Sequence, residues 1–375
     1  MLWKSPADGA PTARTTRPGR GPRLRTGLAA AALLASSRAA LGMPPSSGES
    51  GVSPGGAATW RAVDASALDH AAYLPIVRHG PYYEGAVTFA VVGDYGACAM
   101  TDPGWSCEPA RRVAAMVARW EPAFVVTTGD NNYPSGAPET WAVNTAPYGE
   151  LIPDRFEPAI GNHDYECDAC PEDAFVARFR RSPTRQFAKP SEGDPLVRFF
   201  VLDSNAAEPV DGAIRKKAAR SNPLAPQRAW LQHGLASLRA CWKLVAMHHP
   251  PYSSTTDPGS NPLLDSSAGW RYRQWGADIV LAGHAHTYER ITRSGGFAYL
   301  VVGTGGAPLN TTFGAPVVGS EARIADAHGA VRGHADPTQL VLEYFTVDPA
   351  SPAAGPVLRD VHRIARDCNA PRPSG

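Results

Sequence analysis

The stretch AFVVTTGDNNY at residues 123–133 decides the predicted fold. Its first six residues are apolar or β-branched, as in a strand that is buried on both faces. The run ends at Gly129 and Asp130, and Tyr133 follows three residues after the Asp. A buried strand that ends in a Gly-Asp turn predicts a carboxylate at its carboxyl end, which is where chemistry gathers in open α/β sheets.

Four further motifs carry polar side chains that could bind a metal, and they occur in a fixed order along the chain. Because the carboxyl ends of parallel strands lie at one edge of a sheet, we expect these side chains to meet there. The first and last of the four follow clear apolar runs, and Trp242–Met247 predicts a strand before the third. The motifs are Gly93-Asp94-Tyr95-Gly96, Gly161-Asn162-His163-Asp164, Val245-Ala246-Met247-His248 and Gly283-His284-Ala285-His286.

The remaining pattern predicts a mixed α/β fold in one domain. Helical periodicity over Pro109–Trp120 and Pro226–Arg239 alternates with strands in the first half, and the last third is mostly strand. We therefore expect parallel βαβ units joined by antiparallel strands, with loops over residues 134–157, 165–196 and 253–275. The other predicted strands are Ala86–Val92, Val197–Leu202, Ile279–Ala282, Phe297–Val302, Leu340–Val347 and Val357–Ile364.

The composition excludes several classes of protein. The chain has 375 residues, of which 43% are hydrophobic, and its net charge of +1 gives no general attraction to nucleic acid or to a membrane surface. No segment resembles a Ser–His–Asp nucleophile elbow or a nucleotide-binding P-loop. We expect a small-molecule substrate, no specific nucleic-acid partner, no stable membrane anchor, and a monomer.

The N-terminus reads as a targeting segment over residues 1–42, with a basic region, a short apolar core and a small-residue exit. This pattern predicts an exported protein, secreted or periplasmic; an organellar transit peptide or a disordered tail is the alternative. Residues 43–81 read as a flexible linker and lead-in, residues 82–368 as the catalytic domain, and residues 369–375 as a disordered tail.

The six cysteines fit an oxidising compartment because their number is even. Cys98 and Cys107 flank the segment after the first Gly-Asp motif and could form a local disulfide. Cys241 opens a strand and Cys368 lies in the tail, so this pair could tie down the C-terminus. The Cys167-Asp-Ala-Cys170 pair favours a loop disulfide over a zinc site, because no second pair accompanies it.

The donor types in the five motifs suit a pair of transition metals. Carboxylates, a phenol and a carboxamide supply oxygen, and three imidazoles supply nitrogen, which suits iron, zinc or manganese better than calcium or magnesium. Two histidines that are two residues apart, such as His284 and His286, point the same way in an extended segment. One carboxylate that lies between two ions could bridge them.

The five motifs resemble those of the metallophosphoesterases, the calcineurin-like superfamily, over roughly residues 86–305. Two features resemble the small, single-domain purple acid phosphatases, also called tartrate-resistant acid phosphatases: Tyr133 and the sequence His284-Ala285-His286-Thr287-Tyr288-Glu289-Arg290. Without this resemblance, Tyr133 could be an aromatic residue that only packs in the core. This resemblance implies a four-layer α/β/β/α sandwich of two mixed sheets, with a binuclear metal site at the carboxyl ends of strands.

The resemblance also implies the ligands and the reaction. Asp94, Asp130, Tyr133 and His286 would hold Fe³⁺, and Asp130, Asn162, His248 and His284 would hold Fe²⁺, Zn²⁺ or Mn²⁺. A metal-bound hydroxide would be the nucleophile.

His163 would bind phosphate and protonate the leaving group, and Asp164 would keep His163 protonated or oriented. His249 could contact the substrate, or it could only support its neighbours.

The sequence therefore predicts an exported acid phosphatase that hydrolyses phosphomonoesters. A phosphodiesterase or nucleotide-cleaving enzyme on the same core is the nearest alternative, because loops set the size of the leaving group. A secreted binding protein that keeps the fold without catalysis is an alternative from another class, and the complete set of ligand-type residues argues against it.

Overall fold

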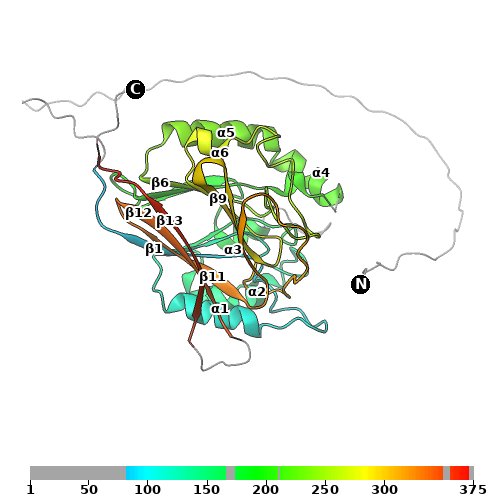
Figure 1. The fold of residues 1–375 in the computed structure, drawn as a ribbon. Coiled ribbons are helices and arrows are strands. Elements are labelled where there is room, and N and C mark those ends of the chain that lie inside the picture. The colour runs from blue at the N-terminus through cyan, green and yellow to red at the C-terminus, as the bar shows by residue number, and fades with distance from the viewer. Residues whose placement is uncertain (1–81, 166–173, 210–211, 349–354, 371–375) are drawn as a thin grey trace, which may run out of the picture. The chain divides into compact units, whose positions relative to one another are not determined.

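The structure is a computed structural model, and it describes residues 82–165, 174–209, 212–348 and 355–370. Its strands form two mixed sheets that face each other, and helices lie on their outer sides (Figure 1). This is the four-layer α/β/β/α sandwich, so the predicted fold class is confirmed.

The first sheet has six strands in the order β13-β12-β11-β1-β2-β3. Strands β1, β2 and β3 are parallel, and β11, β12 and β13 are antiparallel to their neighbours. The bounds are Val87–Val92 for β1, Phe124–Thr127 for β2, Phe156–Pro158 for β3, Gly329–Ala335 for β11, Gln339–Thr346 for β12 and Val357–Ala365 for β13.

The second sheet has seven strands in the order β10-β8-β9-β7-β6-β5-β4. Its four central strands, β5, β6, β7 and β9, are parallel to one another. Strand β4 is antiparallel to β5, β8 is antiparallel to β9, and β10 is antiparallel to β8. The bounds are Arg185–Lys189 for β4, Val197–Val201 for β5, Trp242–Ala246 for β6, Ile279–Ala282 for β7, Tyr288–Arg293 for β8, Phe297–Val302 for β9 and Ser320–Ile324 for β10.

Two groups of helices cover the sheets, and each group presents an apolar face to the strands beneath it. Helices α1 to α4 contribute to the cluster on the outer face of the first sheet, and α5 and α6 pack on the second sheet. The bounds are Glu108–Ala118 for α1, Trp141–Asn144 for α2, Ala174–Phe179 for α3, Gly212–Ser221 for α4, Leu224–Ser237 for α5 and Tyr272–Trp275 for α6.

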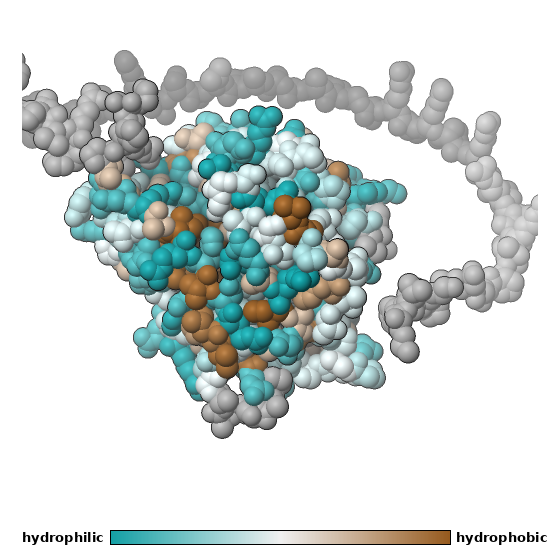
Figure 2. Space-filling model, viewed as in Figure 1, coloured by the Kyte–Doolittle hydropathy of each residue, from teal (hydrophilic) through white to brown (hydrophobic). Residues whose placement is uncertain are grey.

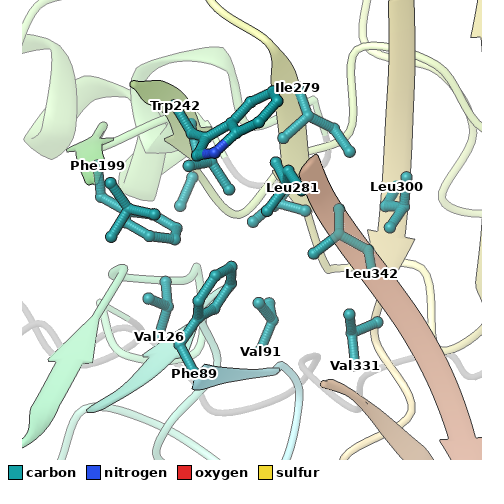
Figure 3. Packing of buried hydrophobic residues seen from close by; sticks show 14 of the residues in the cluster. Phe89, Val91, Val126, Phe199, Trp242, Ile279, Leu281, Leu300, Val331 and Leu342 are labelled. Carbon is teal, nitrogen blue, oxygen red and sulfur yellow. The ribbon is translucent and has the colours of Figure 1, made fainter. Parts of the chain in front are cut away.

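The main hydrophobic core lies between the two sheets, as Figure 3 shows. Phe89 and Val126 of the first sheet point toward Phe199 and Trp242 of the second. The rings of Phe89 and Phe199 meet edge to face, with centroids 5.3 Å apart. Since these central strands are buried on both faces, their near-continuous apolar sequences follow directly from their place in the sandwich.

The sequence-based expectation missed the ten-residue helix α4, the strands β8, β10 and β11, and several shorter elements. The three predicted loops contain α2, α3, α6, β4 and the start of β3, and the strand that precedes the Gly161 motif went unrecognised. These elements have three to six residues, so they are too short to show a clear period. The longer predicted strands and helices are confirmed, with ends shifted by at most about two residues.

Two of the expected disulfides are present. Cys98 and Cys107 are bonded, and Cys241 is bonded to Cys368, which ties the C-terminal end of the described chain to β6. Cys167 and Cys170 lie outside the described residues, as do the predicted targeting segment and residues 43–81 of the linker.

The described chain ends next to its beginning. At the start of the predicted C-terminal tail, the side-chain amide of Asn369 hydrogen-bonds to both the backbone N–H and the carbonyl of Tyr83. Residues 371–375 of that tail are outside the described part of the chain.

The surface of the described chain is mostly hydrophilic in the view of Figure 2, and a narrow hydrophobic strip lies in the region of β13. In this strand Val357, Leu358 and Val361 are exposed. Across the described ranges, every helix is too short or too polar to cross a bilayer.

Candidate metal centre

Tight turns at the ends of parallel strands place three of the expected ligands. Asp94 follows β1, Asp130 follows β2 and His284 follows β7, each directly after a glycine. Their φ angles are 55°, 52° and 69°, in the left-handed region that residues other than glycine rarely adopt. Strained backbone of this kind is held by the surrounding structure and concentrates at functional sites.

Two glycines let the motifs approach each other closely. A Cβ atom on Gly129 would lie 2.4 Å from Nδ1 of His248, and one on Gly161 would lie 2.1 Å from Oδ1 of Asp130. Both positions therefore exclude any side chain, because real Cβ atoms essentially never come so near. These glycines therefore allow neighbouring motifs to lie in direct contact, in addition to forming the turns.

The first group of converging side chains is Asp94, Asp130, Tyr133 and His286. The hydroxyl of Tyr133 donates to Oδ2 of Asp130 at 2.9 Å, and it lies 3.1 Å from Nε2 of His286. Oδ1 of Asp94 is 3.4 Å from that hydroxyl and 3.5 Å from Nε2 of His286. Both carboxylates and the phenol are buried, and His286 is partly exposed toward the surface.

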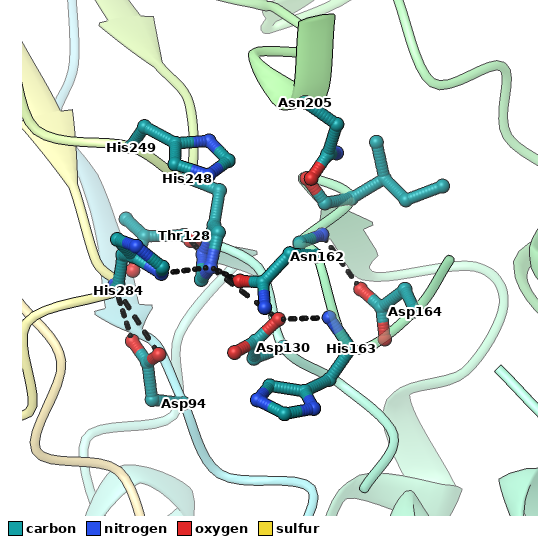
Figure 4. Close-up of polar contacts among 12 residues, drawn as sticks. Asp94, Thr128, Asp130, Asn162, His163, Asp164, Asn205, His248, His249 and His284 are labelled. Atoms are coloured by element: carbon teal, nitrogen blue, oxygen red, sulfur yellow. Dashed lines mark hydrogen bonds and ion pairs between the residues drawn. The ribbon is translucent and has the colours of Figure 1, made fainter. Parts of the chain in front are cut away.

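The second group is Asp130, Asn162, His248 and His284 (Figure 4). Nε2 of His248 lies 2.8 Å from Oδ1 of Asn162, 3.3 Å from Oδ1 of Asp130 and 3.1 Å from Nδ1 of His284. The backbone N–H of His284 donates to the Asp94 carboxylate and thereby joins the second sheet to the first. Asp130 belongs to both groups, as the bridging role requires.

The seven side chains fit a pair of cations. Nδ1 of His248 donates to the carbonyl of Thr128, and Nδ1 of His286 donates to the carbonyl of Pro308. Each bond fixes a proton on Nδ1 and directs Nε2 into the cluster, as in histidines that bind a metal. Nε2 of His284 is buried without a hydrogen-bond partner among the described residues.

The electrostatics of the cluster also favour bound positive charge. Burial alone would lower the pKa of His248, but the carboxylate of Asp130 raises it to about 10. Burial lowers the pKa of His284, and the neighbouring His249 and His248 lower it further, so its imidazole stays neutral. Burial, with the charges of Asp130 and Asp94, holds the pKa of the Tyr133 phenol well above its usual value, so only a strong adjacent cation makes the phenolate favourable.

His163 lies beside the cluster and lines its opening. Its backbone N–H donates to Oδ1 of Asp130, its Nδ1 donates to the carbonyl of Pro134, and its ring packs on Tyr133 with centroids 4.4 Å apart. With Asp130, it lines a cavity of about 360 Å³ that opens on the cluster.

Asp164 is buried, and its carboxylate bonds to residues of the second and third motifs. Its carboxylate accepts the backbone N–H of Asn131, the side-chain amide of Asn131 and the backbone N–H of Gly161. Burial and the charge of Asp130 raise its pKa to about 7. These bonds tie the second motif to the third, so the geometry points to positioning of the backbone that carries Asn162 and His163.

His249 is buried, and both of its ring nitrogens have partners. Nδ1 lies 2.8 Å from the hydroxyl of Ser204, and Nε2 lies 2.8 Å from a carboxylate oxygen of Glu208. Its ring centroid is 4.5 Å from that of His284. Glu208 is buried beside the site, and sequence reasoning missed it because a single Glu in an irregular segment gives no signal.

Comparison with known families supports the same chemistry. A family model described as calcineurin-like phosphoesterase matches residues 87–288, more than half of the chain. Purple acid phosphatase 4 of Arabidopsis thaliana is 24% identical over an alignment of 257 residues, which covers 60% of this chain and 69% of that protein. Tartrate-resistant acid phosphatase type 5 of Homo sapiens is 24% identical over an alignment of 241 residues, which covers 59% of this chain and 73% of that protein.

Solved structures share the fold. The purple acid phosphatase PPD1 from seeds of yellow lupin, Lupinus luteus, superimposes with a TM-score of 0.57 at 20% identity, over 77% of this chain and 55% of that one. GAP50, described as the anchor in the inner membrane complex of Plasmodium, superimposes with a TM-score of 0.54 at 16% identity, over 75% of this chain and 89% of that one.

An anchor protein and a phosphatase thus share this fold, so the fold alone does not establish catalysis. The family match and the phosphatase relatives do establish the class of this chain. The chain belongs to the calcineurin-like phosphoesterase family, and it is a metal-dependent phosphoester hydrolase similar to the purple acid phosphatases.

Proposed function

We propose that this protein is an exported acid phosphatase with a binuclear metal centre, and that it hydrolyses phosphomonoesters of small molecules. The observation that carries the proposal is the position of the Tyr133 hydroxyl, within 3.4 Å of Asp94, Asp130 and His286 at once. A packing aromatic would not direct its only polar atom at two carboxylates and an imidazole in a buried cluster.

Each side chain has a proposed role. Asp94, Asp130, Tyr133 and His286 would hold Fe³⁺, and Asp130, Asn162, His248 and His284 would hold Fe²⁺, Zn²⁺ or Mn²⁺. When bound, the two ions supply a nucleophile from water and polarise the phosphoryl oxygens.

The chain itself would supply the proton for the leaving group. Because Nδ1 of His163 donates to Pro134, the proton for the departing alkoxide would come from Nε2. Asp164 would hold the turn that presents His163, through its bonds to Asn131 and Gly161. We assign His249 a supporting role, because Ser204 and Glu208 already occupy both of its nitrogens.

Export is supported by the two disulfides of the described chain and by the pattern of residues 1–42. We expect the protein to be recovered from the medium or the periplasm as a monomer that lacks its N-terminal residues. Full-length protein that stays reduced inside the cell would contradict export.

Asp130→Ala should lower kcat/KM for 4-nitrophenyl phosphate by more than about 100-fold, since even losing a residue that only supports a metal ligand costs up to about 100-fold. Wild-type turnover should persist in the presence of tartrate. Asp326→Ala is the control, because Asp326 lies on the surface and pairs only with Arg359 in the described chain. Undiminished turnover in Asp130→Ala would refute the assignment, and a panel of monoesters and diesters would separate phosphatase from phosphodiesterase.

His163→Ala should affect poor leaving groups most, because only they need a proton as the ester bond breaks. We expect kcat/KM to fall about 100-fold or more for an alkyl phosphate and less than about tenfold for 4-nitrophenyl phosphate, whose phenolate leaves unaided. His233→Ala, at an exposed histidine of α5, is the control. Equal losses on both substrates would show that His163 does not protonate the leaving group.

A further inference from the structure

A second cavity adjoins the opening of the metal centre. It measures about 400 Å³, and we call it the side cavity. His284, Asp257 and Pro258 line both this cavity and the one that opens on the cluster, so the two cavities lie side by side. A phosphate held at the cluster would place the rest of its ester next to the side cavity, whose volume suits a ring-sized group.

The side cavity combines apolar walls with one positive charge. Pro250, Pro262 and Leu263 contribute apolar surface, and Leu263 is 47% exposed. Among the described residues that line it, Arg215 is the one permanent cation and Asp257 the one carboxylate. Because Asp257 lines both cavities, it lies at their boundary, whereas Arg215 belongs to the side cavity alone.

The wall of the side cavity is held in place by buried bonds. Ser254, three residues before the lining residues 257–263, donates its backbone N–H and its hydroxyl to the carboxylate of Glu289, which is fully buried and also accepts the hydroxyl of Ser320. Further along the same segment, the backbone N–H of Asn261 donates to the carbonyl of Pro250, and its side-chain amide donates to the carbonyl of Ala207. The cavity is therefore built before a ligand arrives, which lowers the entropic cost of binding.

Arg215 is available to a ligand. It lies on α4, the helix at the edge of the molecule in Figure 1, and its side chain is exposed. In the described ranges no carboxylate forms an ion pair with it. The helix carries three further basic residues and no acidic one, although the whole chain has a net charge of only +1. Helix α4 therefore contributes only positively charged side chains around Arg215.

We propose that the side cavity binds the alcohol part of the substrate and that Arg215 selects leaving groups with an apolar body and an anionic substituent. The inference rests on the proposed phosphatase function and adds the class of substrate to it. A ring would lie against the prolines and Leu263, and its anionic group would reach Arg215 beyond the boundary at Asp257.

The test compares two aryl phosphates that differ in one charge, phenyl phosphate and 4-carboxyphenyl phosphate. For each enzyme, kcat/KM on the charged substrate is divided by kcat/KM on the neutral one, which cancels metal loading. Dividing the wild-type ratio by the variant ratio then removes the intrinsic reactivity of the two esters. Because Arg215 is exposed, we expect Arg215→Gln to lower the ratio about three- to fivefold, and Arg215→Glu to lower it further.

The matched control is Arg220→Gln, which removes the same charge from the same helix at a residue that does not line the side cavity. It should leave the ratio unchanged, and raising the salt concentration should shrink the Arg215 effect. An unchanged ratio in Arg215→Gln, or an equal fall in Arg220→Gln, would overturn the proposal while the phosphatase function stands. Failure of the wild type to hydrolyse either ester would overturn the function and, with it, the inference.

Discussion

The carboxylate of Asp130 is the interaction on which the site depends. One oxygen accepts the backbone N–H of His163 and lies 3.3 Å from Nε2 of His248, and the other accepts the hydroxyl of Tyr133. Burial alone would raise the pKa of this carboxyl, but the charges of His248 and His163 hold it far below its usual value. A buried anion of this kind must be matched by positive charge, and its contacts with both groups of ligands explain why two cations would share it.

The two sheets make this arrangement possible. Asp94, Asp130 and Asn162 follow strands of the first sheet, whereas His248, His284 and His286 follow strands of the second. Neither sheet holds a complete donor set for the pair of ions, so the apolar packing between the sheets is also what assembles the centre. Bonds such as that from His248 Nδ1 to the Thr128 carbonyl then fix the relative positions of the two sets at the strand ends.

Much of this could be predicted from the sequence, and the exceptions have physical reasons. The strands before Asp94, Asp130 and His284 are continuous apolar runs that are followed by glycine, so the sequence alone predicts where these strands end. Strand β3 could not be predicted, because it has only three residues and two of them, Glu157 and Pro158, are not typical of a buried strand.

The parts that long-range packing creates could not be predicted. Glu208 bonds to His249, which lies 41 positions away in the sequence. Arg215 lines a cavity whose other lining residues include His249 and His284, 34 and 69 positions further along the chain. Neither Glu208 nor Arg215 belongs to a motif. Asp164 is within a motif, yet its partner Asn131 lies 33 positions away, so its bonds depend on the tertiary structure.

The pair of metal ions is tested most directly by the visible absorption spectrum of the purified protein, together with its metal content. We expect about two transition-metal ions per chain and a visible band from the Fe³⁺–phenolate pair, and we expect Tyr133→Phe to remove that band while the protein stays folded. A fully metallated, active protein without visible absorption, or a band that survives Tyr133→Phe, would contradict the assignment of Tyr133 and of the ferric site.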